Sequence, residues 1–227
     1  RRQARHPARK RPELIATAPG QVYSWDITKL PGPYRGINYD FYVTLDLFSR
    51  AIVGWRVEDS EDDELARQMF REAFAAQGAT PTVVHSDGGP AMTSKTVTEL
   101  FRDLGITASR NRPRVSNDNP YSESNFKTAK YRPNYPGHFT CLEEARAWAE
   151  QFVTWYNTIH RHSALEGHTP ASMHDGTWVA VHHRRQQTLD DLYATHPHRF
   201  ARRPVVKTPM AIVTINQPKT DQRLQTG

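Results

Sequence analysis

The sequence predicts an α/β fold in which a mixed β-sheet is flanked by helices. Three observations support this prediction. Three consecutive β-rich segments are spaced as an antiparallel meander, two shorter strand candidates then alternate with amphipathic helices, and further helical segments follow. The length of 227 residues suits one such domain with extensions at its ends.

The first three strands are predicted from their apolar patterns. Val22–Thr28 alternates between an aromatic face and a polar face, and Asp26 lies on the polar face. The turn-rich segment 31–36 separates this strand from Phe41–Leu47 and Ala51–Val57, which a short Phe-Ser-Arg connection joins into a hairpin. These three strands form the antiparallel part of the predicted sheet.

Two helices then alternate with two short strands, which predicts a parallel addition to the sheet. Ser60 is expected to cap a helix whose apolar stripe runs to Gly78. Thr82–His85 is the next strand candidate, a second helix covers 94–105, and Ile106–Ser109 is the last strand. The expected sheet therefore has three antiparallel strands followed by two parallel ones.

The remaining helices are predicted from their start signals. An Asn-Pro pair opens a helix over 120–130, because proline favours the first helical position after an N-cap. Thr140 and Glu143 have the spacing of a capping box for a longer helix with an apolar face. One weak helical stretch near 179–193 precedes a basic tail that is interrupted by prolines.

The charge distribution divides the chain into three parts. We expect a basic N-terminal arm at 1–19, a core at 20–175 and a basic C-terminal extension at 176–227, with regular structure beginning at Val22. The formal net charge is +6 and the sequence pI is about 9.5. Such a balance indicates a polyanionic partner, and it predicts that the two ends run along that partner or a neighbouring subunit.

Composition excludes several classes of protein. Cys141 is the only cysteine, so disulfide scaffolds and cysteine-based zinc sites are excluded and an intracellular, reducing setting is expected. The chain has no apolar run of about eighteen residues and no signal segment, so no membrane partner is expected. Because the chain begins with Arg1, we expect that residues upstream have been left out.

Three acids occupy positions where the backbone would present them to a common site. Asp26 lies on a strand, Asp87 follows a strand and precedes a Gly-Gly turn, and Glu123 lies in the first turns of a helix. Convergent carboxylates suit Mg²⁺, and two such ions can activate a water or a 3′-hydroxyl for phosphodiester chemistry. Each acid taken singly also fits an ordinary turn or surface charge. Asp46 is a rival to Asp26, ranked lower because the period of its strand leaves its facing ambiguous.

Two lysines accompany the third acid. Lys127 and Lys130 lie on the same helix face as Glu123, one and two turns further along. That face could hold a metal at one end and a DNA phosphate beside it. The alternative for Glu123 and Lys127 is an ordinary surface ion pair.

Several motifs surround these residues and continue beyond them. They are Trp25–Thr28, His85–Gly89, Ser116–Glu123 with Phe126 and Lys127 following, Trp155–Asn157, His160–Ser163 and Thr169-Pro170. In these motifs, and in the thirty-five residues between Asp87 and Glu123, the chain resembles the catalytic core of bacterial insertion-sequence transposases. These belong to the retroviral-integrase superfamily, the DDE enzymes.

The resemblance spans roughly residues 20–175 and implies an RNase H-like fold. It implies that Asp26, Asp87 and Glu123 use two Mg²⁺ ions, for which Mn²⁺ can substitute. Such enzymes nick DNA with water at the terminal repeats of an element, and the freed 3′-hydroxyl then attacks another phosphodiester, without a covalent protein–DNA intermediate. The implied partner is double-stranded DNA, as element ends and as target, bound by a homo-oligomer in the bacterial cytoplasm at the nucleoid.

The same resemblance implies DNA contacts at Lys127 and Lys130, which match DNA-contacting positions of related integrases. Further contacts are expected from the basic loop, the C-terminal motif and the two ends of the chain. These residues are Arg112, Arg114, Arg161, Arg9, Lys10, Arg11, Arg202 and Arg203. His160 is expected to end the long helix, and His85 either to pack its strand or to support the neighbouring Asp87 without contacting substrate.

Two departures from the family pattern accompany the resemblance. Ala164 stands where relatives often have glycine, and no helix-turn-helix region is visible upstream, so sequence-specific binding of element ends by this chain alone is not expected. We expect a transposase catalytic region that breaks and joins DNA strands. The alternatives are an RNase H-like nuclease that does not join strands, and a DNA-binding protein that has lost catalysis.

Overall fold

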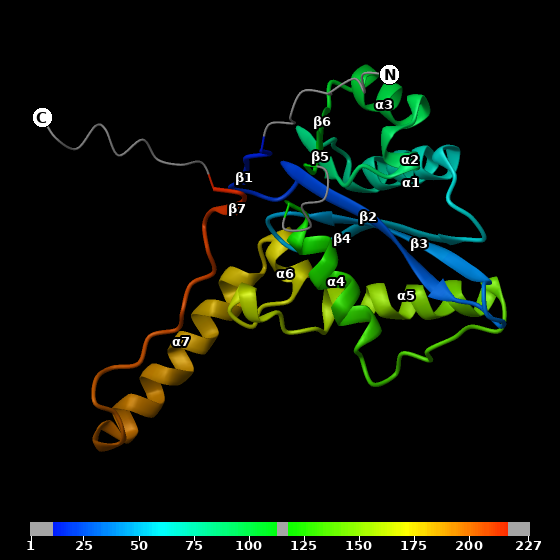
Figure 1. The fold of residues 1–227 in the computed structure, drawn as a ribbon. Coiled ribbons are helices and arrows are strands. Elements are labelled where there is room, and N and C mark those ends of the chain that lie inside the picture. Colours follow the sequence, from blue (N-terminus) through cyan, green and yellow to red (C-terminus); the bar gives the residue numbers. More distant parts are fainter. Residues whose placement is uncertain (1–10, 113–117, 218–227) are drawn as a thin grey trace, which may run out of the picture.

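The computed structural model describes residues 11–112 and 118–217. A five-stranded sheet forms its centre, and helices cover both faces (Figure 1). The strands are β2 (Val22–Pro31), β3 (Asn38–Asp46), β4 (Ile52–Glu58), β5 (Val83–Ser86) and β6 (Thr107–Arg110). Their order across the sheet is β4-β3-β2-β5-β6.

The pairing of these strands confirms the predicted mixed sheet. β2 pairs antiparallel with β3, and β3 pairs antiparallel with β4. β5 adds parallel to β2, and β6 adds parallel to β5. Since parallel neighbours need a crossover, each of the last two strands is reached through helices.

One face of the sheet is covered by α1 (Asp63–Gln77), α2 (Pro90–Thr93) and α3 (Lys95–Asp103) (Figure 1). The ring of Trp25 on β2 packs edge-on against Phe70 of α1, at 5.1 Å between ring centres. The four-residue α2 is absent from the sequence prediction, because a single turn is too short to show a helical period.

The start of α1 differs from the prediction. Asp62, and not Ser60, is the N-cap, and its side chain accepts hydrogen bonds from two backbone N–H groups of the first turn. Ser60 lies outside the helix, where its carbonyl oxygen accepts a hydrogen bond from the Tyr42 hydroxyl. Gly78 ends the helix as predicted, in the left-handed conformation at φ 66°.

The other face of the sheet is covered by α4 (Pro120–Lys130) and α5 (Leu142–Thr158) (Figure 1). Phe41 of β3 lies at the centre of this layer and contacts Trp148 and Phe152 of α5, with ring centres 6.2 and 6.3 Å away. Such edge-to-face aromatic contacts add to the burial of apolar surface.

The predicted capping box of α5 is wrong by one residue. The N-cap is Cys141, and Glu144 is the acid that reaches back, with its Oε2 2.6 Å from both the backbone nitrogen and the hydroxyl of Thr140. Glu143 therefore lies one position too early to close the box.

A helical arm leaves the body after α6 (Pro170–Asp175) (Figure 1). It consists of α7 (Trp178–Thr195), which agrees with the helix predicted near 179–193, and of a segment that returns beside it. The return is held to α7 by Gln186, whose amide bonds the backbone of Pro204 and Val206. In the part of the chain that the structure describes, no helix combines the length and apolarity needed to cross a membrane.

The returning segment ends in a strand that the sequence did not predict. β7 (Val213–Ile215) pairs antiparallel with β1 (Leu14–Ala16) in a small second sheet. Both strands contribute buried side chains to a third apolar cluster, beside Val22 and Leu47. Regular structure therefore begins before Val22, and at these strands the two ends pack on the chain's own core.

A tight contact between β4 and α1 gives a test of this packing. A Cβ atom added to Gly54 would lie 2.9 Å from the Cβ of Ala73. We expect Gly54→Ala to lower the free energy of unfolding by about 1–3 kcal/mol through overpacking, as measured by urea denaturation. Ala73→Gly should lower it by about 1 kcal/mol or more on its own.

The double variant separates the two effects. Because the second substitution removes the clash created by the first, the double variant should be more stable than the sum of the single losses predicts. Strictly additive losses would contradict the proposed contact.

Candidate active site

The parallel register of β2 and β5 brings the first two acids together. Trp25 lies beside Ser86 in this register; Asp26 is the next residue of β2, and Asp87 directly follows the end of β5. Asp87 therefore lies at the carboxyl end of its strand, where α/β proteins commonly place functional groups, and beside Asp26 on β2. The alternation of β2 buries Trp25 in the core and leaves Asp26 only half-buried.

Burial and nearby negative charges both act on the pKa of Asp26. Burial is the largest influence and, together with the charge of Asp87, raises the pKa of Asp26 to about 7. Glu123 and Glu61 raise this pKa further, and the backbone N–H of Ile27, which donates to Oδ1 at 2.8 Å, lowers it. Like charges that crowd a half-buried carboxylate favour its protonated form.

Asp87 is positioned by the turn that follows β5. Its Oδ1 accepts a hydrogen bond from the backbone N–H of Gly89 at 2.8 Å. The turn continues into α2, where Glu61 Oε1 accepts from the N–H of Ala91 at 3.0 Å. Sequence reasoning missed Glu61, because a glutamate before a helix has no distinguishing local pattern.

Glu123 reaches the site because buried polar contacts dock the start of α4 on β2. The Ser24 hydroxyl donates to Asn119 Oδ1 at 2.6 Å, and it lies 2.9 Å from the Ser122 hydroxyl, which must then be the donor of that pair. Asn119 is the N-cap of α4 by position, but its side chain bonds Ser24 instead of the helix. Ser24 shares the polar face of β2 with Asp26, which is the sequence signal for its role.

His85 supports the same region from β5. Its Nε2 lies 2.8 Å from the carbonyl oxygen of Asp118, and its Nδ1 lies 2.9 Å from the Ser109 hydroxyl. Burial lowers the pKa of His85, so the ring is neutral. Because a carbonyl oxygen only accepts, the proton resides on Nε2 and Nδ1 accepts from Ser109. His85 thus has the supporting role expected from the sequence.

Arg112 is held in an ion pair with buried Asp118. Its Nε and Nη2 each lie 3.0 Å from a carboxylate oxygen of Asp118, and its backbone N–H donates to the same group. The Arg112 Nε and Nη2 donors, which could otherwise bind a phosphate in a bidentate way, are thus already bonded to Asp118. Arg112 therefore holds Asp118 in place just before α4. Arg114, another predicted DNA contact, lies outside the described residues.

The lysine face of α4 borders an open groove of about 360 Å³. Glu123, Lys127 and Lys130 line it from successive turns, together with Phe126 and Tyr131. Lys127 is exposed. The Lys130 ammonium lies on the strand side of the groove, where it donates to the Thr28 hydroxyl at 2.7 Å.

Asp46 does not belong to the site. It is fully buried, and its Oδ1 accepts from the backbone N–H and the hydroxyl of Ser49, both at 2.7 Å. Its Oδ2 accepts from the N–H of Gly20 at 2.7 Å. These contacts stabilise the hairpin between β3 and β4, which explains the acid in this position and agrees with its lower rank.

The other predicted DNA contacts are distributed widely. Arg161 and Arg202 are exposed, whereas Arg203 is paired through two hydrogen bonds with Asp190 of α7. Arg11 is half-buried at the start of the described chain. Arg9 and Lys10 lie outside the described residues.

His160 has the structural role expected for it. Its backbone N–H donates to the carbonyl oxygen of Trp155 in the last turn of α5, and its ring stacks on Tyr156 at 5.5 Å. It therefore closes the end of the helix.

The donor set of the site fits a hard divalent cation such as Mg²⁺. Asp26, Asp87 and Glu123 supply carboxylate oxygens, and their mutual repulsion is what a cation would relieve. Within the described ranges, no three His, Cys, Asp or Glu side chains stand close enough to enclose an ion as they are. The acids thus form an open set along one side of the site.

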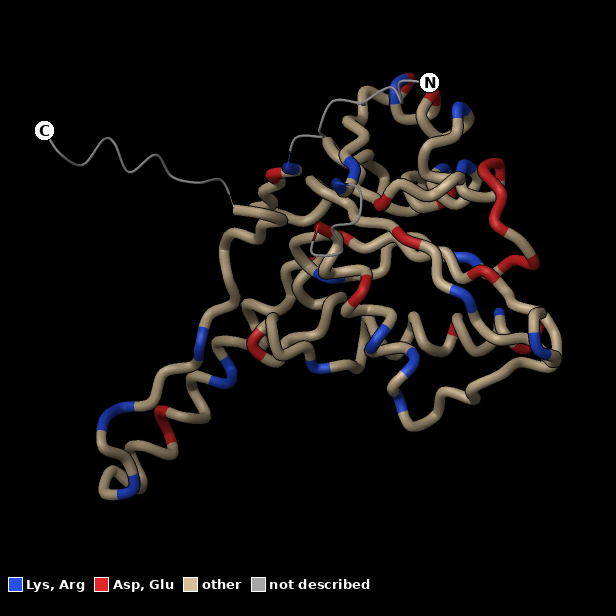
Figure 2. The backbone as a smooth tube through the Cα atoms, in the orientation of Figure 1, with Lys and Arg blue, Asp and Glu red and all other residues tan. Residues whose placement is uncertain are grey.

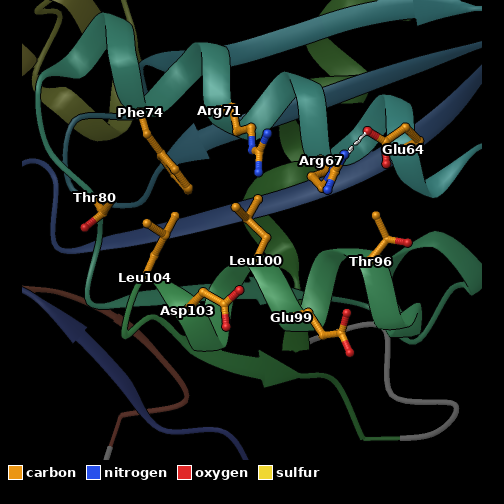
Figure 3. A pocket seen from close by; sticks show the side chains of 10 residues that line it. All are labelled: Glu64, Arg67, Arg71, Phe74, Thr80, Thr96, Glu99, Leu100, Asp103 and Leu104. Atoms are coloured by element: carbon orange, nitrogen blue, oxygen red, sulfur yellow. Dashed lines mark hydrogen bonds and ion pairs between the residues drawn. The ribbon is translucent and has the colours of Figure 1, made fainter.

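A larger hollow, of about 470 Å³, lies between α1 and α3 and away from these acids (Figure 3). Arg67 and Arg71 line it from α1, and Glu99 and Asp103 face them from α3 (Figure 3). Arg67 is already paired with Glu64. With opposite charges on its two walls, this hollow offers no convergent set of acids.

Two family models match the chain, and both are described as integrase core domain. The first matches residues 16–116 and the second matches residues 104–170. Together they contain all three acids.

Relatives of known classification are similar over most of the same region. The transposase for insertion sequence element IS904 of Lactococcus lactis is 35% identical over 167 residues, which cover 70% of this chain and 65% of that protein. The transposase for insertion sequence element IS629 of Shigella sonnei is 27% identical over 168 residues, which cover 74% of this chain and 56% of that protein. The chain thus spans 65% and 56% of the length of these two relatives.

A solved structure shares the fold. The HTLV-2 integrase catalytic core domain in complex with magnesium is similar with a TM-score of 0.51 and 20% sequence identity, over 69% of this chain and 97% of that chain. This similarity confirms the RNase H-like fold expected from the sequence.

The raised pKa of Asp26 predicts a dependence of stability on pH. Below about pH 4 the carboxyl is protonated in both states. Between about pH 4 and about pH 7 the unfolded state ionises while the folded state keeps its proton, so folded stability is lost as pH rises. Asp26→Asn cannot ionise, and relative to the wild type it should gain on the order of 4 kcal/mol between pH 4 and pH 8.

Urea denaturation at several pH values in the presence of EDTA measures this gain. Glu150→Gln removes an exposed carboxylate of α5 and serves as the control, with no such dependence expected. A difference between Asp26→Asn and wild type that stays constant with pH would contradict the crowding of charge at Asp26.

Proposed function

The chain belongs to the integrase core domain family, and from this membership we propose that it is the catalytic region of an insertion-sequence transposase. It would cut DNA strands at the ends of a mobile element and join them to another DNA. The observation that carries this proposal is the placement of Asp87, at the end of β5, beside Asp26 on β2, with Glu123 near enough to raise the pKa of Asp26 further after burial and Asp87. The IS904 and IS629 transposases, which are similar over most of this region, support it.

The three acids would together hold two Mg²⁺ ions, for which Mn²⁺ can substitute. Bound there, the ions would activate a water or a 3′-hydroxyl and stabilise the leaving oxygen of a phosphodiester. The chain itself contributes the placement of the carboxylates. Asp26 and Asp87 are fixed by strand register and backbone N–H groups, and Glu123 by the docking of α4.

The lysine face of α4 would hold the DNA backbone beside the acids. Lys127 lines the groove next to Glu123 and is exposed to solvent. Its ammonium can therefore approach a phosphate of DNA bound in the groove. Lys130 points to Thr28, where it would fix the position of α4 on β2 and add positive charge to the same groove.

Further DNA contacts are proposed for exposed basic residues outside the core. Lysine and arginine positions occur along both α7 and its returning segment (Figure 2), and Arg202 is exposed there. Arg161 at the end of α5 is exposed as well. We retain 20–175 as the catalytic core, with basic extensions on either side, and infer that the protein acts as an oligomer on chromosomal DNA in the bacterial cytoplasm.

Replacement of the third acid tests the proposed chemistry. We expect Glu123→Gln to lower strand cleavage and strand joining by about 10³-fold or more, since it removes a metal ligand that is worth several kcal/mol in the transition state. The assay uses duplex DNA that carries the element's ends, with Mg²⁺ present, and EDTA should abolish the activity. Glu150→Gln is the matched control.

The same assay discriminates other functions. Cleavage without joining would indicate a nuclease, and DNA binding without turnover would indicate a protein that has lost catalysis. Full activity of Glu123→Gln, or activity of the wild type in EDTA, would refute the proposed active site.

Replacement of Lys127 tests the proposed DNA contact. Lys127→Ala should weaken DNA binding and reduce the slope of log affinity against log salt by about 1, because one phosphate contact and its released counterion are lost. Lys95→Ala on α3 removes an exposed lysine elsewhere and should leave the slope unchanged. Fluorescence anisotropy over a range of salt concentrations measures both, and equal slopes for Lys127→Ala and wild type would argue against the contact.

A further inference from the structure

β7 contacts the start of α4 although it is distant in the sequence. The Tyr121 hydroxyl donates to the backbone oxygen of Thr214 at 2.8 Å, and the Asn216 amide donates to Asp118 Oδ1 at 2.7 Å. Asp118 and Tyr121 flank the first residues of α4, and Glu123 follows two residues later. β7 and Asn216, the residue that follows it, therefore bond the chain just before and just inside the start of α4, two residues ahead of the third acid.

Asp118 is the buried centre of these contacts. Its carboxylate is inaccessible to solvent and accepts hydrogen bonds from the guanidinium of Arg112 and from the side-chain amide of Asn216. These hydrogen bonds, that of Arg112 above all, hold the pKa of Asp118 well below its usual range. Its carbonyl oxygen receives His85. A buried carboxylate is stable only when its oxygens are satisfied, so each donor fixes the position of the chain at Asp118.

Asn216 has a backbone conformation that few residues adopt. Its φ is 53°, in the left-handed region, where asparagine is tolerated better than most other side chains. The chain turns there, directly after β7, and this turn aims the amide at Asp118. The conformation and the residue type thus both serve the contact.

Tyr121 is held from two sides. The guanidinium of Arg50, from the hairpin between β3 and β4, lies 3.7 Å from the centre of the Tyr121 ring. The hydroxyl is bound by β7 at the other end of the side chain. Arg50 is itself buried and donates to the carbonyl oxygen of Leu47. The tyrosine is therefore fixed between the central sheet and β7.

We propose that β7 positions Glu123 through Asn216 and Tyr121, so that the C-terminal segment is part of the active-site support. The inference rests on the proposed function for the role of Glu123. β7 belongs to a separate two-stranded sheet with β1 and adds no hydrogen bond to the five-stranded sheet. Instead, the polar contacts that Thr214 and Asn216 make are with Tyr121 and Asp118 at the start of α4. Asn216 and Tyr121 are positioning residues, because they act through α4.

Two substitutions in the 227-residue chain test the inference. Asn216→Gly removes the amide and keeps a residue that adopts the left-handed conformation freely. Tyr121→Phe removes the hydroxyl, with its hydrogen bond to Thr214 and its polar contact with Arg50, and keeps the ring beneath the Arg50 guanidinium. For each we expect kcat of strand cleavage to fall about 10- to 100-fold with the Kd for DNA nearly unchanged, because small displacements of a reacting group have effects of that size. The Mg²⁺ concentration for half-maximal activity should rise.

Hydrogen exchange provides a measurement that needs no activity. The backbone amides of residues 122 and 123 should exchange faster in both variants, whereas those of β3 should be unchanged. Gln68→Ala is the matched control, because it removes a side-chain hydrogen bond to Glu72 on the exposed face of α1 without touching α4 or β7. It should leave exchange in α4 and kcat as in the wild type.

The outcomes separate this inference from the proposed function. Unchanged exchange at residues 122 and 123 in folded Asn216→Gly, or a loss of kcat no larger than the unfolded fraction, would overturn the positioning role. Faster exchange in α4 together with a wild type that cleaves no DNA would support the positioning by β7 and count against the proposed function alone. Faster exchange with the expected loss of kcat supports both.

Discussion

Repulsion between like charges at one edge of the sheet is the constraint on which the rest of the structure depends. Asp26, Asp87 and Glu123 come from three different elements, and the raised pKa of Asp26 reflects first its burial and then the nearby negative charges, that of Asp87 above all. No lysine or arginine forms an ion pair with any of the three among the described residues. The acids remain together because the backbone around each is fixed, and the charge is left available for a cation.

The fold provides that rigidity in two ways. For Asp26 and Asp87 it is the strand register, which places adjacent residues of two hydrogen-bonded strands side by side. For Glu123 the support is a group of buried polar side chains, because α4 buries little apolar surface apart from Phe126 and Ala129. That group is Ser24, His85, Asp118, Asn119 and Ser122. Hydrogen bonds specify a position more narrowly than apolar contact does, and inside a protein they strengthen one another.

Local patterns predicted the parts of this arrangement that depend on neighbouring residues. The alternation of β2 placed Asp26 on the polar face, the Gly-Gly turn marked Asp87, and an Asn-Pro pair marked the start of α4. Motif resemblance then joined the three acids into one site. The wrong helix starts, at Ser60 and at the Thr140 capping box, differ from the observed ones by one or two residues, since several adjacent side chains there are able to cap.

Long-range polar partners could not be predicted in this way. Arg112 was expected at DNA because a basic loop looks the same in sequence whether or not an acid is buried beside it. Its partner, Asp118, stands only six residues away, but the sequence does not show that this acid is buried against Arg112. β7 is three residues long, and it pairs with β1, which lies near the opposite end of the described chain. No period of the sequence marks such a strand, since its stability comes from the core that it covers.

These supports make the third acid depend on the complete chain. The sheet that positions Asp26 and Asp87 is closed by residue 110, before α4 begins. The start of α4 then takes contacts from β2, from the hairpin at Arg50 and from β7, which lies beyond the helical arm. In a chain that has folded its sheet but not docked its C-terminal segment, Asp26 and Asp87 would be in position, whereas Glu123 would be held only loosely. Because such chemistry needs all three carboxylates in position, the fold couples assembly of the active site to the docking of the last strand.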